Sequence, residues 1–346
     1  MMAYSSELFF QYSSYMSVKN KLRWGMIGAG TIAHSFVKDF YFMKNAVLVA
    51  VATSDKDRGQ EFARQYNIPL ACTYKELYGN NEVDVVYIST THNFHYEQAL
   101  ACLQNGKAVL CEKPITVNIT ECNELIKVAK EKSVFLMEAM WTYFLPSIHK
   151  AKQWIDEGRI GKLKVIQADF SYPMKKDITG RMYNPDLAGG SLLDLGIYPI
   201  YIANYFANKS PKFITASGKL TQTGVDERLG ILLQYDDDVT ATLFSSIVTR
   251  MKNKCHLFGE KGHIEVPDFW RAYSAKIFNA DFELLETFND GRISHGFIYE
   301  MQHVNDKVLH GDTESDVIPI SKSKDVQTIM MEVRRQIGLI YPMDMT

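Results

Sequence analysis

The sequence predicts an α/β protein in two parts: a doubly wound parallel sheet first, then an α+β part with a mostly antiparallel, open-faced sheet. Three observations predict this fold class. Short apolar strands alternate with helices as far as residue 141, which is typical of a parallel sheet covered on both faces. Strands of antiparallel character dominate afterwards. The length of 346 residues suits two domains of roughly 150 residues each.

The alternating part is expected to form a first domain at residues 21–142, after an N-terminal arm at residues 1–20. Its first helix has helical apolar spacing through Ile32, Phe36, Phe40 and Met43. We expect strands at residues 21–30, 46–53, 83–90, 107–114 and 134–141, and helices at residues 31–43, 56–67, 95–106 and 118–132.

The second domain is expected at residues 143–346. The stretch YDDD reads as a hairpin turn inside one long strand region, and the closing helix could pack back on the first domain. We expect helices at residues 146–161, 189–206 and 324–342, and strands at residues 163–172, 213–223, 227–249, 255–266 and 274–288.

Composition excludes several classes of protein. A net charge of -2 gives no electrostatic footprint for nucleic acid. No apolar run reaches the length of about 20 residues that a membrane span needs, and the first residues lack the features of a signal peptide. Met16 opens a second plausible start, so the residues before it are a natural arm or a start-site artefact. Five cysteines, with no Cys-x-x-Cys pair, indicate a reduced, cytoplasmic protein.

The glycine loop GAGTIA, Gly28 to Ala33, lies between a strand and a helix and predicts a dinucleotide site. Gly28 allows the tight turn, Gly30 lets backbone approach a pyrophosphate, and Ala33 lets helix and strand pack closely. The helix N-terminus then offers free N–H groups to the anion. We therefore assign Gly28, Ala29, Gly30, Thr31 and Ile32 to coenzyme binding, within a Rossmann domain.

The end of the second strand leaves the choice between NADP and NAD open. NAD binders usually carry an acid there to hold the ribose hydroxyls. Here Thr53 and Ser54 stand at the strand end, with Asp55 one step later and Arg58 within reach of a 2′-phosphate. Hydroxyls and a cation favour NADP slightly, whereas Asp55 favours NAD. The alternative is that Lys56 and Arg58 only begin a solvated helix, in which case they give no evidence for a 2′-phosphate.

Two constellations predict chemistry. Lys113, in the stretch LCEKPIT, stands at the carboxyl end of a strand, where ligands of open parallel sheets bind. Pro114 restricts Lys113 to an extended conformation, which would aim its amine. Asp194 and Tyr198, four residues apart in GGSLLDLGIYP, share one helix face, and Pro199 predicts a kink. Alone, each residue has a structural explanation, as a surface Lys or a packed Tyr bonded to Asp194.

The motifs GAGTIA, CEKP and GGSLLDLGIYP, in this order, resemble the glucose–fructose oxidoreductase/inositol dehydrogenase/rhizopine catabolism (Gfo/Idh/MocA) family. The resemblance runs from about residue 21 to 341 and is strongest to the dimeric dihydrodiol dehydrogenase and D-xylose dehydrogenase subgroup. It implies that Lys113 and Tyr198 are catalytic, and that Asp194 and His92 face substrate or nicotinamide. We also count Asp194 as catalytic, and we assign Thr90, His92, His95, Glu112 and Lys113 to the coenzyme and Lys113, Trp141, Asp194 and Tyr198 to the substrate.

Two positions depart from the pattern of the relatives. NADP-binding relatives often have Arg where Ser54 stands, and relatives tend to carry Arg where Tyr143 stands. His92 and His95 have i, i+3 spacing, but no Cys or acid cluster completes a metal site, so we expect no metal.

We predict an NAD(P)-dependent oxidoreductase that moves a hydride between nicotinamide and a sugar, polyol or diol. For Tyr198 to act as a base, its pKa must fall by roughly three units from about 10, and the ammonium of Lys113 is the expected cause. A catalytically silent dinucleotide-binding regulator and an aldehyde or imine reductase remain alternatives.

The expected assembly is a homodimer or a dimer of dimers. The second sheet carries apolar residues, and too few helices follow to cover both of its faces. The residues taken to mark the open face are Ile231, Leu233, Leu243, Ile247 and Val248.

Overall fold

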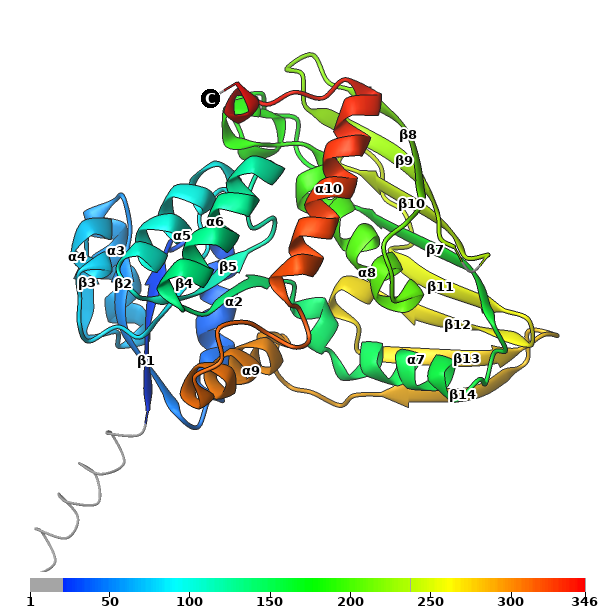
Figure 1. Cartoon of the computed structure of the whole chain (residues 1–346), viewed down its shortest axis with the longest axis horizontal. Coiled ribbons are helices and arrows are strands. Elements are labelled where there is room, and N and C mark those ends of the chain that lie inside the picture. The colour runs from blue at the N-terminus through cyan, green and yellow to red at the C-terminus, as the bar shows by residue number, and fades with distance from the viewer. Residues whose placement is uncertain (1–20, 237, 346) are drawn as a thin grey trace, which may run out of the picture.

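The computed structural model describes residues 21–236 and 238–345; the expected N-terminal arm lies outside the described residues (Figure 1). Two sheets stand side by side, and helices from the second part of the chain lie between them. No helix among the described residues is long and apolar enough to cross a membrane.

The first sheet is parallel throughout, with the strand order β3-β2-β1-β4-β5-β6. The order reverses between β1 and β4, which opens a crevice beyond the carboxyl ends of these strands. Its strands are β1 (Leu22–Ile27), β2 (Ala46–Ala52), β3 (Leu70–Cys72), β4 (Val85–Ile88), β5 (Ala108–Glu112) and β6 (Leu136–Ala139). Its helices are α2 (Thr31–Phe40), α3 (Lys56–Tyr66), α4 (Tyr74–Tyr78), α5 (His95–Gln104) and α6 (Ile119–Lys132).

The predicted parallel sheet is confirmed, with two differences of detail. Sequence reasoning missed β3 and α4, because three and five residues are too short to show a period. The predicted apolar face of α2 holds at Phe36 and Phe40, which are buried, but not at its ends. Ile32 is 36% exposed beside the glycine loop, whereas Met43 lies past the end of the helix but is buried in the core.

The second sheet is mixed, with the order β14-β13-β12-β11-β7-β10-β9-β8. Only β7 and β10 pair in parallel, so the prediction of a mostly antiparallel sheet is confirmed. Its strands are β7 (Leu163–Ser171), β8 (Phe213–Leu220), β9 (Asp226–Gln234), β10 (Thr240–Ser246), β11 (Lys254–Gly259), β12 (Gly262–Pro267), β13 (Ser274–Asn279) and β14 (Leu284–Asn289). The helices are α7 (Pro146–Asp156), α8 (Ile197–Ala207), α9 (Phe297–His310), which was not predicted, and α10 (Ile320–Ile337).

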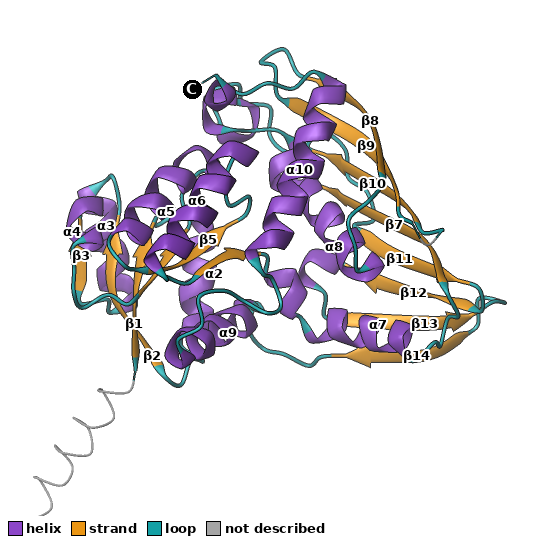
Figure 2. Ribbon diagram, in the orientation of Figure 1, coloured by secondary structure: helices purple, strands orange, loops and turns teal. Residues whose placement is uncertain are grey.

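Helices α7, α8 and α10 pack on one side of this sheet, and Figure 2 shows no helix on the other. The residues chosen to mark the open face were wrong. Ile231, Leu233, Leu243 and Ile247 are buried, and only Val248 is exposed. Side chains alternate between the faces of a strand, and most of the chosen set points toward the helices.

The open face carries a different apolar set. The rings of Phe258 and His263 stack with centroids 5.4 Å apart, and those of His263 and Phe278 with centroids 4.6 Å apart. Leu232, on β9, is exposed. We call Phe258, His263 and Phe278 the outer-face cluster; Leu232 lies on the same face, separated from them by β7 and β10.

Helix α10 contacts both halves of the molecule, packing on β8 and α8 as well as on α6. Gln327 donates a hydrogen bond to the carbonyl of Thr116 at 2.7 Å, and Arg334 donates to the carbonyl of Val117 at 2.9 Å. Both carbonyls lie in the loop that follows Lys113, so the C-terminal helix supports the chain next to the crevice.

The N-terminus of α9 is capped by a carboxylate from another helix. Asp39 of α2 is buried and accepts hydrogen bonds from the backbone amides of His295, Gly296 and Phe297 at 2.8, 2.8 and 2.9 Å. Gly296, at the N-cap position, has no side chain to do this. Asp39 therefore satisfies amides that α9 leaves free.

We predict that Asp39→Ala lowers the free energy of unfolding by about 2–4 kcal/mol, because buried amides lose their acceptor. Urea unfolding followed by circular dichroism measures the change. The matched control is Asp57→Ala, which removes an exposed carboxylate from α3. Equal midpoints for the two variants would contradict the capping role of Asp39.

Candidate functional site

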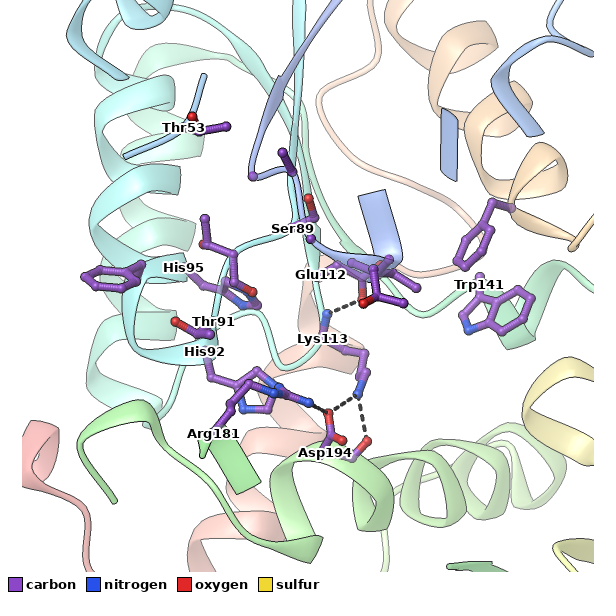
Figure 3. A pocket seen from close by; sticks show the side chains of 18 of the residues that line it. Thr53, Ser89, Thr91, His92, His95, Glu112, Lys113, Trp141, Arg181 and Asp194 are labelled. Carbon is purple, nitrogen blue, oxygen red and sulfur yellow. Dashed lines mark hydrogen bonds and ion pairs between the residues drawn. The ribbon is translucent and has the colours of Figure 1, made fainter. Parts of the chain in front are cut away.

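A cavity of about 600 Å³ lies beyond the carboxyl ends of the first sheet and reaches the second part of the chain (Figure 3). It is lined by every residue that the sequence assigned to the coenzyme and the substrate. Those residues are Gly28, Ala29, Gly30, Thr31, Ile32, Thr53, Ser54, Arg58, Thr90, His92, His95, Glu112, Lys113, Trp141, Asp194 and Tyr198.

The glycine loop has the geometry of an anion cradle. Gly28 has φ +104°, and a Cβ there would lie 2.9 Å from the carbonyl oxygen of Ser89. A Cβ on Gly30 would meet no atom within 4 Å, so backbone is bare toward the cavity. Helix α2 has no side-chain cap and no acidic residue in its first turn. Its free amides therefore fit a pyrophosphate.

At the far end of the cavity, Thr53, Ser54 and Arg58 line the wall. Asp55, which favoured NAD at the sequence level, has another role: its Oδ1 accepts a hydrogen bond from the amide of Arg58 at 3.0 Å and caps α3. This placement removes the main argument for a ribose-binding acid at Asp55.

Lys113 points from the end of β5 toward the second part of the chain. Its Nζ donates to the backbone carbonyl of Asp194 at 2.7 Å and to Asp194 Oδ1 at 3.2 Å. It also lies 4.9 Å from the ring centre of Tyr198. The structure thus brings together the two constellations that the sequence separated by 81 positions.

Asp194 belongs to a single π-helical turn, Leu192–Gly196, which runs directly into α8; we call it the π-turn. In a π-helix the amide of residue i+5 bonds to the carbonyl of residue i. Five residues after Asp194 stands Pro199, which has no N–H. The carbonyl of Asp194 accepts from Lys113 instead. Pro199 accordingly offers no amide to the carbonyl of Asp194, which is available to the ammonium of Lys113.

Arg181 completes the charged cluster, and sequence reasoning missed it. Its Nη2 lies 2.8 Å from Asp194 Oδ1, and its Nη1 lies 3.2 Å from His92 Nε2. Burial alone would raise the pKa of Asp194, but the charges of Lys113 and Arg181 outweigh burial and hold that pKa well below its usual range. Asp194 is therefore a carboxylate held between two cations, as Figure 3 shows.

His92 is a neutral ring in this cluster. Its Nε2 faces Arg181, which can only donate, so Nε2 is the acceptor. Nδ1 then carries the proton and donates to the carbonyl of Ala188 at 3.1 Å. Burial, followed by the charges of Arg181 and Lys113, lowers the pKa of His92 well below 6.5. His92 is thus unsuited to accept a second proton near neutral pH.

The electrostatic expectation for Tyr198 is wrong for this state of the chain. Burial, and next the carboxyl of Glu112, raise the pKa of Tyr198 well above 10. The ammonium of Lys113 is bound by Asp194 and does not reverse this. The hydroxyl of Tyr198 accepts from Trp141 Nε1 at 3.2 Å rather than bonding to Asp194. Tyr198 is a protonated phenol here.

The remaining assigned residues shape the cavity. Glu112 accepts from the hydroxyl of Tyr87 at 2.6 Å, and burial raises its pKa. His95 places Nδ1 2.8 Å from the carbonyl of Pro114 and Nε2 3.2 Å from that of Thr90, and burial lowers its pKa to about 4. These contacts connect Glu112 and Pro114, the two neighbours of Lys113, to β4 and the loop that follows it.

Tyr143, where relatives tend to carry Arg, does not line the cavity. It is buried, and its hydroxyl donates to the carbonyl of Tyr201 at 2.7 Å. The guanidinium beside Asp194 comes from Arg181 instead. No three His, Cys, Asp or Glu side chains group as metal ligands in residues 21–236 and 238–345.

Aromatic residues that carry no local motif form one wall. Trp141 stacks on Phe297 with centroids 4.4 Å apart, and Phe170 stacks on Trp270 with centroids 4.3 Å apart. They come from four separate segments, so only the tertiary fold brings them together. Lining residues missed at the sequence level are Tyr74, Ser89, Thr91, Phe94, Phe170, Arg181, Leu195, Trp270 and Phe297.

Comparison with family models and curated proteins gives consistent matches. The Gfo/Idh/MocA model for an oxidoreductase domain with an NAD-binding Rossmann fold matches residues 22–140, and the Gfo/Idh/MocA C-terminal domain model matches residues 148–265. Trans-1,2-dihydrobenzene-1,2-diol dehydrogenase of Mus musculus is 36% identical over 332 residues, covering 93% of this chain and 99% of the relative. The Xenopus tropicalis enzyme of that name is 35% identical over 329 residues, covering 92% and 99%.

Solved structures share the fold. A 3-ketoreductase from Actinomadura kijaniata, in complex with NADP and TDP-benzene, superposes with a TM-score of 0.82 at 25% identity, covering 92% of this chain and 98% of the other. Aldose-aldose oxidoreductase from Caulobacter crescentus gives 0.84 at 21% identity with the same coverage. A levoglucosan dehydrogenase in complex with NADH gives 0.83 at 18% identity, covering 92% and 97%.

We predict that the ring of His92 stays neutral, as the Nδ1–H tautomer, between about pH 8 and pH 5.5, because burial and two neighbouring cations disfavour the imidazolium. Nitrogen NMR of protein labelled in its histidine rings measures this, and His92→Asn assigns the signal. A His92 signal that titrates near pH 6.5 would contradict the geometry.

Proposed function

Because the chain belongs to the Gfo/Idh/MocA oxidoreductase family, we propose that it uses NAD(P) to transfer a hydride to or from a carbon bearing a hydroxyl group, in a sugar, polyol or trans-dihydrodiol. One observation carries this proposal: Lys113, Asp194 and Tyr198 converge in the cavity that also contains the bare glycine loop. The named relatives act on diols and sugars, and structural neighbours are solved with NADP or NADH.

In this proposal the residues of the cavity have separate roles in binding the substrate and in transferring the proton. The nicotinamide supplies the carbon that gives or takes the hydride. Lys113 donates a hydrogen bond to the reacting oxygen of the substrate, and Asp194 and Arg181 keep the ammonium in place. Tyr198 holds a proton at neutral pH and passes it to a carbonyl oxygen in reduction, and it takes that proton back in oxidation. The aromatic wall packs on the substrate ring and excludes water.

Reduction of a carbonyl group is the direction that the charges favour. Because its raised pKa keeps Tyr198 protonated at neutral pH, the phenol has a proton to give to a carbonyl oxygen but must first ionise before it can act as a base. Oxidation of an alcohol through the same residue should therefore gain rate as the pH rises. A silent regulator has no comparable support, since the residues for proton transfer and for coenzyme binding line one cavity.

The assembly follows from the open face of the second sheet. We propose that residues 143–346 form a substrate-binding and dimerisation domain after a coenzyme domain at residues 21–142. The outer-face cluster would be covered by the same cluster of a second copy, giving a homodimer or a dimer of dimers. The five cysteines are all free thiols, which supports a reducing, cytoplasmic location.

We predict that Tyr198→Phe and Lys113→Met each lower turnover by about 10²–10⁴-fold while coenzyme still binds, because general acid–base help is lost and the glycine loop is untouched. The two losses should not add, since the residues act as a unit. Substrate panels followed by nicotinamide absorbance give turnover, and fluorescence titration gives coenzyme affinity.

The matched controls make the same chemical changes outside the cavity. Tyr143→Phe removes a buried hydroxyl, and Lys107→Met removes an ammonium that donates to carbonyls at the opposite end of β5. Both should keep turnover near that of the native chain. Native turnover in Tyr198→Phe would refute the role of the phenol.

We predict that NADP binds more tightly than NAD, because Ser54 and Arg58 line the coenzyme end of the cavity while Asp55 caps α3. Arg58→Ala should weaken NADP by about tenfold and NAD less, since only NADP offers a phosphate to the guanidinium. Lys56→Ala, outside the cavity wall, is the control. Tighter binding of NAD by the native chain would reverse the assignment.

We predict a particle of twice the chain mass of 39.5 kDa, or a multiple of that, in sedimentation. A double variant, Phe258→Glu with Phe278→Glu, should dissociate it, since charges opposite each other in an apolar contact are costly. Leu309→Glu, an exposed position on α9, should leave the mass unchanged. A monomeric native chain at micromolar concentration would exclude this assembly.

A further inference from the structure

A buried carboxyl lies directly beneath the π-turn. Asp226, the first residue of β9, is fully buried and faces Ser191 and Leu192. Its Oδ2 accepts from the hydroxyl of Ser191 at 2.6 Å and from the backbone amide of Leu192 at 2.8 Å. Ser191 occupies the N-cap position of the π-turn but makes no capping bond of its own. Asp226 supplies the cap from another element.

The sequence is adapted to this contact. Gly190 has φ +107°, and a Cβ there would lie 2.2 Å from Asp226 Oδ1. A Cβ on Gly196 would lie 2.9 Å from the hydroxyl oxygen of Ser245, which itself lies 3.0 Å from that of Ser191. Both ends of the π-turn therefore rest on polar groups of β9 and β10, at distances that only glycine permits.

This contact sits two residues before Asp194 and six before Tyr198, on one continuous helical segment. A carboxylate at the N-terminus of such a segment also interacts favourably with the helix dipole. We propose that Asp226 is a positioning residue: by holding Ser191 and the amide of Leu192, it fixes the turn that sets Asp194 and Tyr198 against Lys113. The inference rests on the proposed function of the site.

The contact has an energetic cost, which argues for a role beyond folding. Burial raises the pKa of Asp226 to about 7, although the bonds from Ser191 and Leu192 favour the carboxylate. A carboxyl whose pKa is raised on folding binds its proton more tightly in the native state, so ionising it lowers stability as the pH rises toward 7. Asp226 forms no ion pair among the described residues, and its Oδ1 has no hydrogen-bond partner.

The other groups that face Asp226 do not change their charge near neutral pH. Ser191 and Ser245 are hydroxyls. Tyr341, from the C-terminal segment, also lies near Asp226. Burial, followed by the charge of Asp226, raises the pKa of Tyr341 well above 10. The hydroxyl of Tyr341 donates to the carbonyl of Gly189 at 2.5 Å, one residue before Gly190. Asp226 is therefore the group at this point whose charge changes near neutral pH.

The test compares Asp226→Asn with the native full-length chain. We expect kcat to fall by about ten- to a hundred-fold, because small displacements of reacting groups are costly. The affinity for NADP should stay within about twofold, since the glycine loop lies on the other domain. In the native chain kcat should fall as the pH drops through about 7, where Asp226 gains a proton. The variant should lack that inflection.

Stability supplies a second readout. From about pH 4 to pH 7 the thermal midpoint of the native chain should fall relative to that of Asp226→Asn, which has no charge to bury, and the difference should level off at higher pH. Ser191→Ala removes one of the two donors and should lower kcat by a smaller factor, so the proposal stays testable if Asp226→Asn folds poorly. The control is Asp84→Asn, whose carboxyl accepts from the amide and Nε of Arg23, both at 2.9 Å, away from the cavity. It should keep native kcat.

Suppose that the native chain turns over its substrate and that Asp226→Asn has the same kcat and the same pH profile. That result would overturn the inference and leave the proposed function standing. Equal losses of turnover and NADP affinity would also overturn it, because they indicate general disruption. A native chain that turns over no diol, sugar or carbonyl substrate with either coenzyme would refute the proposed function and the inference with it.

Discussion

The contact between Lys113 and Asp194 is the constraint on which the rest of the site depends. It joins the end of β5 in the first sheet to the π-turn of the second part of the chain. Both side chains are largely buried, and a buried charge is tolerated only when it is paired. Arg181 adds a second cation to the same carboxylate. Three elements distant in sequence must therefore meet at one point before any of these charges is stable.

Much of the local sequence can be understood as support for that point. Pro199 withholds an amide, so the carbonyl of Asp194 is available to Lys113. Gly190 lets Asp226 approach the start of the turn. A carboxylate capping a helix from another element occurs again at Asp39 and α9, whose residue Phe297 lines the cavity. In both places a buried aspartate accepts hydrogen bonds from backbone amides of a segment whose side chains line the cavity.

Sequence alone predicts the parts of this site that short segments determine. The glycine loop and Lys113 each stand at the end of a β-strand in the parallel sheet, and such ends meet at one edge. Asp194 and Tyr198 share a segment, so their spacing places them together. Arg181, Trp270 and Phe297 lie in segments without a motif, and only long-range packing brings them to the cavity. For the same reason strand pairing, not composition, decides which apolar residues of the second sheet remain exposed.

Electrostatics was the least predictable property, because it depends on burial and on which partner each charge takes. The proximity of Lys113 to Tyr198 suggested a lowered phenol pKa. Asp194 binds the ammonium instead, and burial, followed by the carboxyl of Glu112, raises the pKa of Tyr198. The phenol of Tyr198 would lose its proton more readily beside the positive charge of an oxidised nicotinamide, and less readily beside the neutral reduced form. The protonation of Tyr198 would then follow the redox state of the coenzyme. The raised pKa of Tyr198 therefore favours proton donation to a carbonyl group, and it is compatible with oxidation once an oxidised nicotinamide lowers that pKa.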